Sequence, residues 1–140
     1  MLRNIQHPSL DNNIEAVLQG EQLVTEFWIS EEDKLKYAQE LIKDNSDYCL
    51  GVLGKRAFFS HKKNIKEAKL LSIAMKYRIH TPYLLGRLFG YQELAIKEFY
   101  LTDDRYDKGD LLYRFLEDRK DFPNMVSNIL SNKAYRLLDW

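Results

Sequence analysis

The stretch YCLGVLGKRAFFS, residues 48–60, decides how the first half of this chain folds. Two apolar and aromatic runs, 48–53 and 56–60, flank the pair Gly54-Lys55. Short runs of this composition favour extended backbone, and a glycine-containing pair between them is typical of a tight turn. The stretch therefore predicts a β-hairpin.

Upstream of the hairpin, LVTEFWI (23–29) is rich in β-branched and aromatic residues and predicts a further strand. Ser30 and the acidic residues 31–33 come next, a composition that favours a helix N-terminus capped by Ser30. The helix is expected to run to Lys43, before the turn signal at 44–45.

Downstream of the hairpin, the apolar spacing is helical throughout. One helix is expected over 64–79, and Thr81 and Pro82 are expected to cap and begin the next. Further helices are predicted over 92–101 and 110–120, and Pro123 is expected to start the last one. The fold class predicted is α+β, with a small N-terminal α/β portion containing the hairpin (about 22–60) packed on a helical portion (about 64–140).

Length and composition are typical of one globular domain, residues 1–140, with a single core. The one cysteine, Cys49, excludes an internal disulfide. The opening residues show no charged-then-apolar signal pattern, and no apolar run approaches membrane-spanning length. We therefore expect a cytoplasmic protein with no membrane partner, and the oligomeric state is left open.

The most informative feature for function is the distribution of charge. The net charge is zero, but residues 54–89 hold nine Lys and Arg against one acidic residue, Glu67. Residues 1–53 carry four bases and ten acids, and residues 90–140 carry eight bases and ten acids. A block of one sign creates a local field that attracts anions whatever the net charge is.

Helical periodicity turns this block into a candidate surface. On a helical wheel Lys62, Lys66, Lys69 and Lys76 fall within about 80° of one another, opposite the apolar positions. The resulting hypothesis is a non-catalytic binding protein whose basic face, 54–87, contacts nucleic acid or an acidic protein surface. The candidate contact residues are Lys55, Arg56, Lys62, Lys63, Lys66, Lys69, Lys76, Arg78, Tyr83 and Arg87.

Two other interpretations of the same block stay open. The lysines are also what keeps an amphipathic helix soluble, with the acidic regions folding back to neutralise them. The helices 64–79 and 82–89, joined by a short turn, also resemble the spacing of a helix-turn-helix, with Tyr83 and Arg87 on the second helix. However, that second helix is mostly apolar and its turn lacks glycine.

Catalytic and metal-binding signals are sparse. The three histidines and Cys49 form no known metal-ligand spacing, no glycine-rich phosphate loop is present, and no metal or cofactor is implied. A metal-independent RNase is an alternative, because general acid–base groups and cations occur together in the block, namely His61, His80, Lys62, Arg56 and Tyr77.

The acidic half offers another alternative. A stoichiometric inhibitor or immunity-type protein would block a protein partner through the acidic residues between 21 and 47. These are Glu21, Glu26, Glu31, Glu32, Asp33, Glu40, Asp44 and Asp47.

Overall fold

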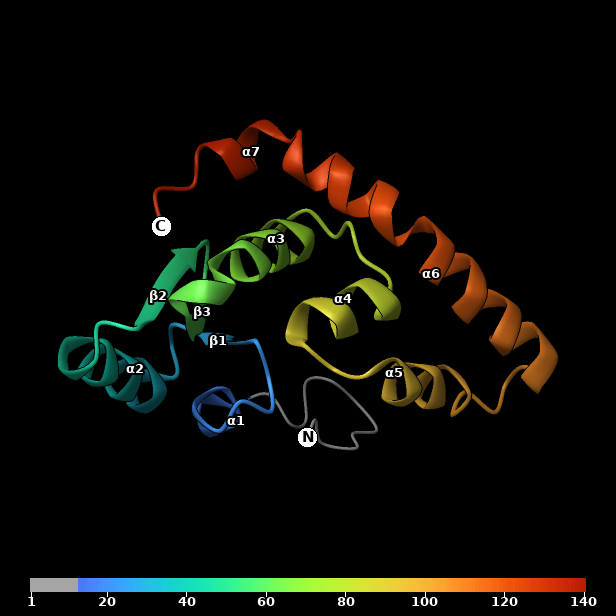
Figure 1. Ribbon diagram of the computed structural model, residues 1–140, viewed down its shortest axis with the longest axis horizontal. Coiled ribbons are helices and arrows are strands. Elements are labelled where there is room, and N and C mark those ends of the chain that lie inside the picture. The colour runs from blue at the N-terminus through green and yellow to red at the C-terminus, as the bar shows by residue number, and fades with distance from the viewer. Residues whose placement is uncertain (1–12) are drawn as a thin grey trace.

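The computed structural model describes residues 13–140 and shows the α+β fold that the sequence predicts. Its N-terminal part is a three-stranded antiparallel sheet made of β1 (Val24–Trp28), β2 (Tyr48–Leu53) and β3 (Arg56–His61). The strand order is β1-β3-β2, so the predicted hairpin is confirmed and β1 pairs with its second strand. This order places β3 in the centre of the sheet (Figure 1).

Alternation along the strands gives the sheet two apolar faces. Phe27, Ala57 and Phe59 form one core, which α1 (Ile14–Leu18) and α2 (Glu32–Asp44) cover. Val24 and Phe58 belong to the other core, against which α3 (Ile65–Lys76) packs. The sheet therefore separates the acidic helix α2 from the basic helix α3 (Figure 1).

The helical part follows a short 3-10 turn, η2 (Lys62–Asn64), and continues from α3. It comprises α4 (Pro82–Phe89), α5 (Glu93–Tyr100), α6 (Lys108–Leu130) and α7 (Lys133–Arg136), and α6 runs along the outside of α4 and α5 (Figure 1). The predicted start of α4 is confirmed: Thr81 Oγ1 accepts a hydrogen bond from the Leu84 N–H at 3.2 Å. No helix within residues 13–140 combines the length and apolar character needed to cross a membrane.

Two helix boundaries differ from the sequence prediction. Pro123 does not begin a helix but lies inside the continuous α6. It is exposed, and Phe115 and Ile129, on either side of it along α6, are buried and hold the helix against the core. At α2 the N-cap position is Glu31 and not Ser30, and the Glu31 side chain makes no capping hydrogen bond, because its Oε2 accepts from the Trp28 N–H of β1 at 2.9 Å.

A buried polar network joins α4, α5 and α6. The Tyr100 hydroxyl accepts from the Tyr83 N–H at 2.9 Å and donates to Asp118 Oδ2 at 2.6 Å. The Tyr83 hydroxyl donates to Glu93 Oε1 at 2.6 Å and accepts from Arg87 at 2.8 Å. Burial, followed by the hydrogen bond to Asp118, raises the pKa of Tyr100 strongly, so that its hydroxyl stays a donor.

The last residues return to the sheet. Trp140 stacks on Phe58 with ring centroids 5.9 Å apart, and its indole lies flat against Gly51 of β2. A Cβ at position 51 would stand 2.0 Å from the indole carbons, so only glycine permits this contact. The sheet face that α3 covers is therefore closed on its β2 side by Trp140.

Candidate functional site

Part of the basic block of residues 54–89 lines a pocket where the hairpin turn meets the C-terminal end of α3. Its cavity is about 200 Å³, and four of its ten lining residues are cationic. No acidic residue lines it, a contrast with the zero net charge of the chain. The lining consists of Trp28, Leu53, Gly54, Lys55, Arg56, Phe58, Ser72, Met75, Lys76 and Arg78.

Arg56 is the fixed cation of this pocket. It begins the central strand, opposite Trp28 on one neighbour and Leu53 on the other. Its guanidinium donates to Glu26 Oε2 at 2.8 Å and stacks over the Trp28 ring at 4.0 Å. Glu26 and Trp28 thus orient the guanidinium before any ligand arrives.

Lys55 and Lys76 are exposed and approach the pocket from different elements. The Lys76 ammonium lies over the hairpin turn, 3.5 Å from where a Cβ on Gly54 would stand. Within the described residues, the ammonium groups of Lys55 and Lys76 and the guanidinium of Arg78 have no carboxylate within 4.0 Å. Their positive charge is therefore directed to solvent.

Arg78 has an unusual backbone. Its φ is +55°, and it is the single non-glycine residue with positive φ within residues 13–140. It ends α3 in a Schellman motif, with Arg78 N–H to Met75 O at 3.4 Å and Ile79 N–H to Ala74 O at 2.9 Å. Glycine is the usual residue at this position, because a Cβ there costs about 1–2 kcal/mol.

The positive charges of Arg56 and Arg78 also act on His80. Partial burial lowers the pKa of its imidazole, and the neighbouring positive charges of Arg56 and Arg78 lower it further. The imidazole is therefore neutral at pH 7. A bound anion would oppose the repulsion from the two arginines.

The other predicted lysines lie away from the pocket. Lys62 and Lys63 are in η2, and Lys66 is in the first turn of α3. Since α3 has 12 residues, these side chains stand about 18 Å from its C-terminal end. Lys62, Lys63 and Lys66 are exposed and Lys69 is half-buried, so they extend the basic face along α3 without entering the pocket.

Tyr83 and Arg87 belong to a different part of the molecule. Tyr83 is 1% exposed and its hydroxyl lies in the polar network already described. Arg87 donates to that hydroxyl and stacks over Phe122 at 4.6 Å, on α6. The two residues therefore stabilise helix packing, and α4 offers little free surface for a recognition helix.

The two histidines of the RNase alternative lie apart. His80 is beside Arg56, at the start of β3, whereas His61 is at its end, five residues and about 16 Å along the strand. His61 Nδ1 accepts from the Lys63 N–H at 3.1 Å and so caps η2. An acid–base pair on one phosphate needs both groups within hydrogen-bond reach of it.

Among residues 13–140, no carboxylate of the acidic half lies within 4.0 Å of a lysine ammonium of the basic face. Glu26 pairs with Arg56, and Glu31 pairs with Lys34 at 3.1 Å and accepts a hydrogen bond from the Trp28 N–H. The hydrogen bond from the Trp28 N–H lowers the pKa of Glu31. The remaining acids of α2 and the loop after it are exposed on the side of the sheet away from α3, namely Glu32, Asp33, Glu40, Asp44 and Asp47.

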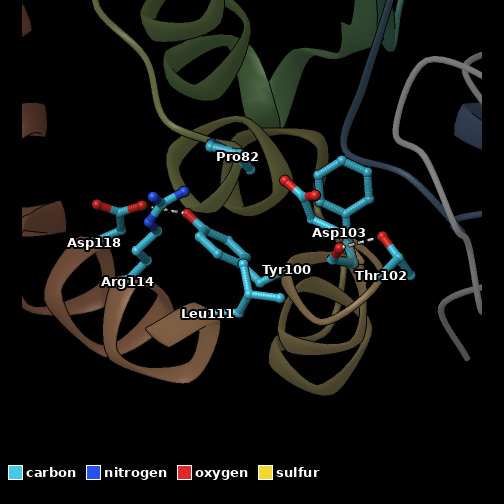
Figure 2. A pocket seen from close by; sticks show the side chains of 8 residues that line it. Pro82, Tyr100, Thr102, Asp103, Leu111, Arg114 and Asp118 are labelled. Carbon is cyan, nitrogen blue, oxygen red and sulfur yellow. Dashed lines mark hydrogen bonds between the residues drawn. The ribbon is translucent and has the colours of Figure 1, made fainter. Parts of the chain in front are cut away.

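A second pocket, between α4, α5 and α6, has a cavity of about 280 Å³ (Figure 2). Figure 2 shows the Tyr100 hydroxyl pointing to Asp118, with Arg114 beside this pair. Asp103 is bound by Arg105 through two side-chain hydrogen bonds of 3.0 and 2.9 Å, which hold the pKa of Asp103 at about 2. Its carboxylates thus have partners within residues 13–140, unlike Lys55, Lys76 and Arg78 of the basic pocket.

Within residues 13–140 no group of three or more His, Cys, Asp and Glu side chains is placed to hold a metal ion. The chain matches no protein-family model, and searches of curated proteins and of solved structures find no match. Function must therefore be argued from the pocket itself.

Trp28 is the site residue that the sequence did not reveal. It is 46% exposed and forms one wall of the basic pocket. Its strand was predicted, but its position beside Arg56 depends on β1 pairing with β3. That pairing joins residues about 30 positions apart, and no local pattern encodes it.

Proposed function

We propose that this protein binds nucleic acid through the basic face formed by the pocket and α3. The observation that carries the proposal is a concave site with four cations, an exposed indole and no carboxylate in its lining. Lysine and arginine bind phosphate groups without reading sequence, and an exposed aromatic ring offers a surface for a base.

Nucleic acid fits this site better than an acidic protein does. The four cations line one cavity of about 200 Å³, which suits a compact anion with several acceptor oxygens, such as a phosphodiester. Carboxylate side chains on a protein surface are spread over separate positions and meet a flat charged patch more readily than a pocket. The lysines along α3 then continue the cationic path for neighbouring phosphates.

The test is a binding titration with fluorescein-labelled DNA and RNA of mixed sequence, followed by anisotropy between about 50 and 200 mM salt. We expect affinity to fall steeply with salt. The double variant Lys55→Ala/Lys76→Ala should weaken binding at each salt concentration and reduce the slope of log K against log salt by about 2, one for each lost phosphate contact.

The matched control is Lys36→Ala/Lys43→Ala, which removes two exposed lysines from α2 on the other side of the sheet. It changes the net charge equally and should leave the slope as it is. Equal effects of the two double variants would show a nonspecific charge effect and contradict the proposal, as would absence of binding at low salt. Electrophoresis of the labelled RNA after incubation in EDTA shows whether it stays intact, as a binding protein requires.

A further inference from the structure

We infer that the basic pocket is a subsite for one nucleotide of a single strand, with a phosphate held by the cations and its unpaired base stacked on Trp28. This inference rests on the proposed function and narrows its ligand from nucleic acid in general to single-stranded DNA or RNA. It starts from the side chains that form the pocket walls.

The phosphate position follows from the free cations. Lys55, Lys76 and Arg78 come from the hairpin turn and the end of α3, and none has a carboxylate partner within the described residues. Arg56 is already paired with Glu26, so it orients the site while the other three neutralise the ligand. A phosphate in the cavity would also lie near His80, which the fields of Arg56 and Arg78 reach.

The base position follows from Trp28. The Arg56 guanidinium covers one face of the indole at 4.0 Å, yet the residue remains 46% exposed. We assign the base to the exposed part of this indole, since aromatic side chains stack on unpaired bases. The bases of a duplex are stacked on each other and cannot do this, whereas those of a single strand can.

The backbone at Arg78 supports the assignment independently. Arg78 occupies a position where the turn geometry favours glycine, because its φ is positive. Its guanidinium is the fourth cation in the lining of the pocket. The Schellman motif requires the positive φ but not the arginine, and strained residues of this kind cluster at binding sites. Here the strain places a guanidinium at the rim of the cavity.

The experiment compares labelled oligo(dT), oligo(U) and a blunt-ended DNA duplex of equal length, with the full chain and with Trp28→Ala. We expect both single strands to bind about tenfold more tightly than the duplex. Trp28→Ala should weaken single-strand binding by about tenfold, the effect of one stacked base, and should weaken duplex binding much less, through the loss of Arg56 orientation alone. Trp28→Phe keeps an aromatic face and should restore part of the loss.

Tyr113→Ala is the matched control, because Tyr113 is a 64% exposed aromatic residue on α6, away from the pocket. Thermal unfolding of each variant identifies any that is not folded. Equal affinities for single strand and duplex, or equal effects of Trp28→Ala on both, would overturn the nucleotide subsite while salt-dependent binding kept the proposed function. Loss of binding to every oligonucleotide in the unsubstituted protein would overturn both.

Discussion

Helices α3 and α4 both end in a Schellman motif, but the residue with positive φ is arginine in α3 and glycine in α4. In α4, Gly90 has φ +94° and Tyr91 N–H bonds to Gly86 O at 2.9 Å. In α3, Arg78 has φ +55° and Ile79 N–H bonds to Ala74 O at 2.9 Å. The hydrogen bonds are equivalent, so the difference lies in what the side chain does.

The surroundings explain each choice. Gly90 lies against Leu23, whose N–H donates to Phe89 O at 2.8 Å, so the chain has no room for a side chain there. Arg78 is exposed and lines the basic pocket. The end of α4 is thus built for packing, whereas the end of α3 carries strain and gains a cation. One motif thus carries a packed glycine in α4 and an exposed cation in α3.

The strongest way to test this contrast is Gly90→Ala. The new Cβ would stand 2.6 Å from Leu23 Cγ and 2.9 Å from the Leu23 nitrogen, and alanine would adopt a positive φ. Left-handed strain and overpacking together should lower the free energy of unfolding by about 2–4 kcal/mol. Urea denaturation measures this value, and a loss below about 1 kcal/mol would contradict the packing role.

Arg78→Gly should have a smaller effect of the opposite sign. Relief of about 1–2 kcal/mol of strain exceeds the entropic cost of glycine, about 0.5–1 kcal/mol, so unfolding should require up to about 1 kcal/mol more. Oligonucleotide affinity should fall in the same variant, because a free cation of the pocket is lost. The two measurements must move in opposite directions; if both fall, Arg78 is a structural residue.

The smallest expected effect concerns His80. Burial and the nearby arginines lower its pKa from the ordinary value of 6.5 in the folded protein. The unfolded chain therefore binds the proton at a higher pH, and stability present above pH 6.5 is lost as pH falls through the folded pKa. Denaturation at several pH values should show this loss, and His80→Gln should remove that part of it.

Nuclear magnetic resonance titration of the His80 ring gives the matching result for binding. A phosphate near Arg56 and Arg78 offsets their repulsion, so bound oligonucleotide should move the His80 pKa upward. No movement, with binding verified in the same sample, would place the phosphate outside the pocket.

Local chemistry was enough to predict much of the fold. The hairpin, the strand before it and the start of α4 at Thr81-Pro82 each depend on neighbouring residues, and each is confirmed. The prediction that Pro123 starts a new helix is wrong. Proline usually interrupts a helix, but buried residues on both sides of Pro123 hold α6 together. Tertiary packing decided that position.

The cations of the site were also visible in the sequence, but their grouping was not. Lys55, Lys76 and Arg78 meet because α3 packs back across the hairpin, whereas Lys62 and Lys63 stay at the other end. Tyr83 is buried and Arg87 is exposed, and both contact the helices next to α4, away from the pocket. The sequence shows how many basic residues a segment has, whereas the fold determines which of them lie close together.

The pocket is formed by three separate segments, so ligand binding would be coupled to the stability and degradation of the protein. β1, the hairpin turn and the end of α3 meet only in the folded chain, so an unfolded molecule has no such site. A ligand at a concentration 100 times its Kd would add about 2.7 kcal/mol to the free energy of unfolding. Occupied molecules would escape proteolysis and empty ones would be degraded first, so the cellular amount of this protein would follow the supply of its ligand.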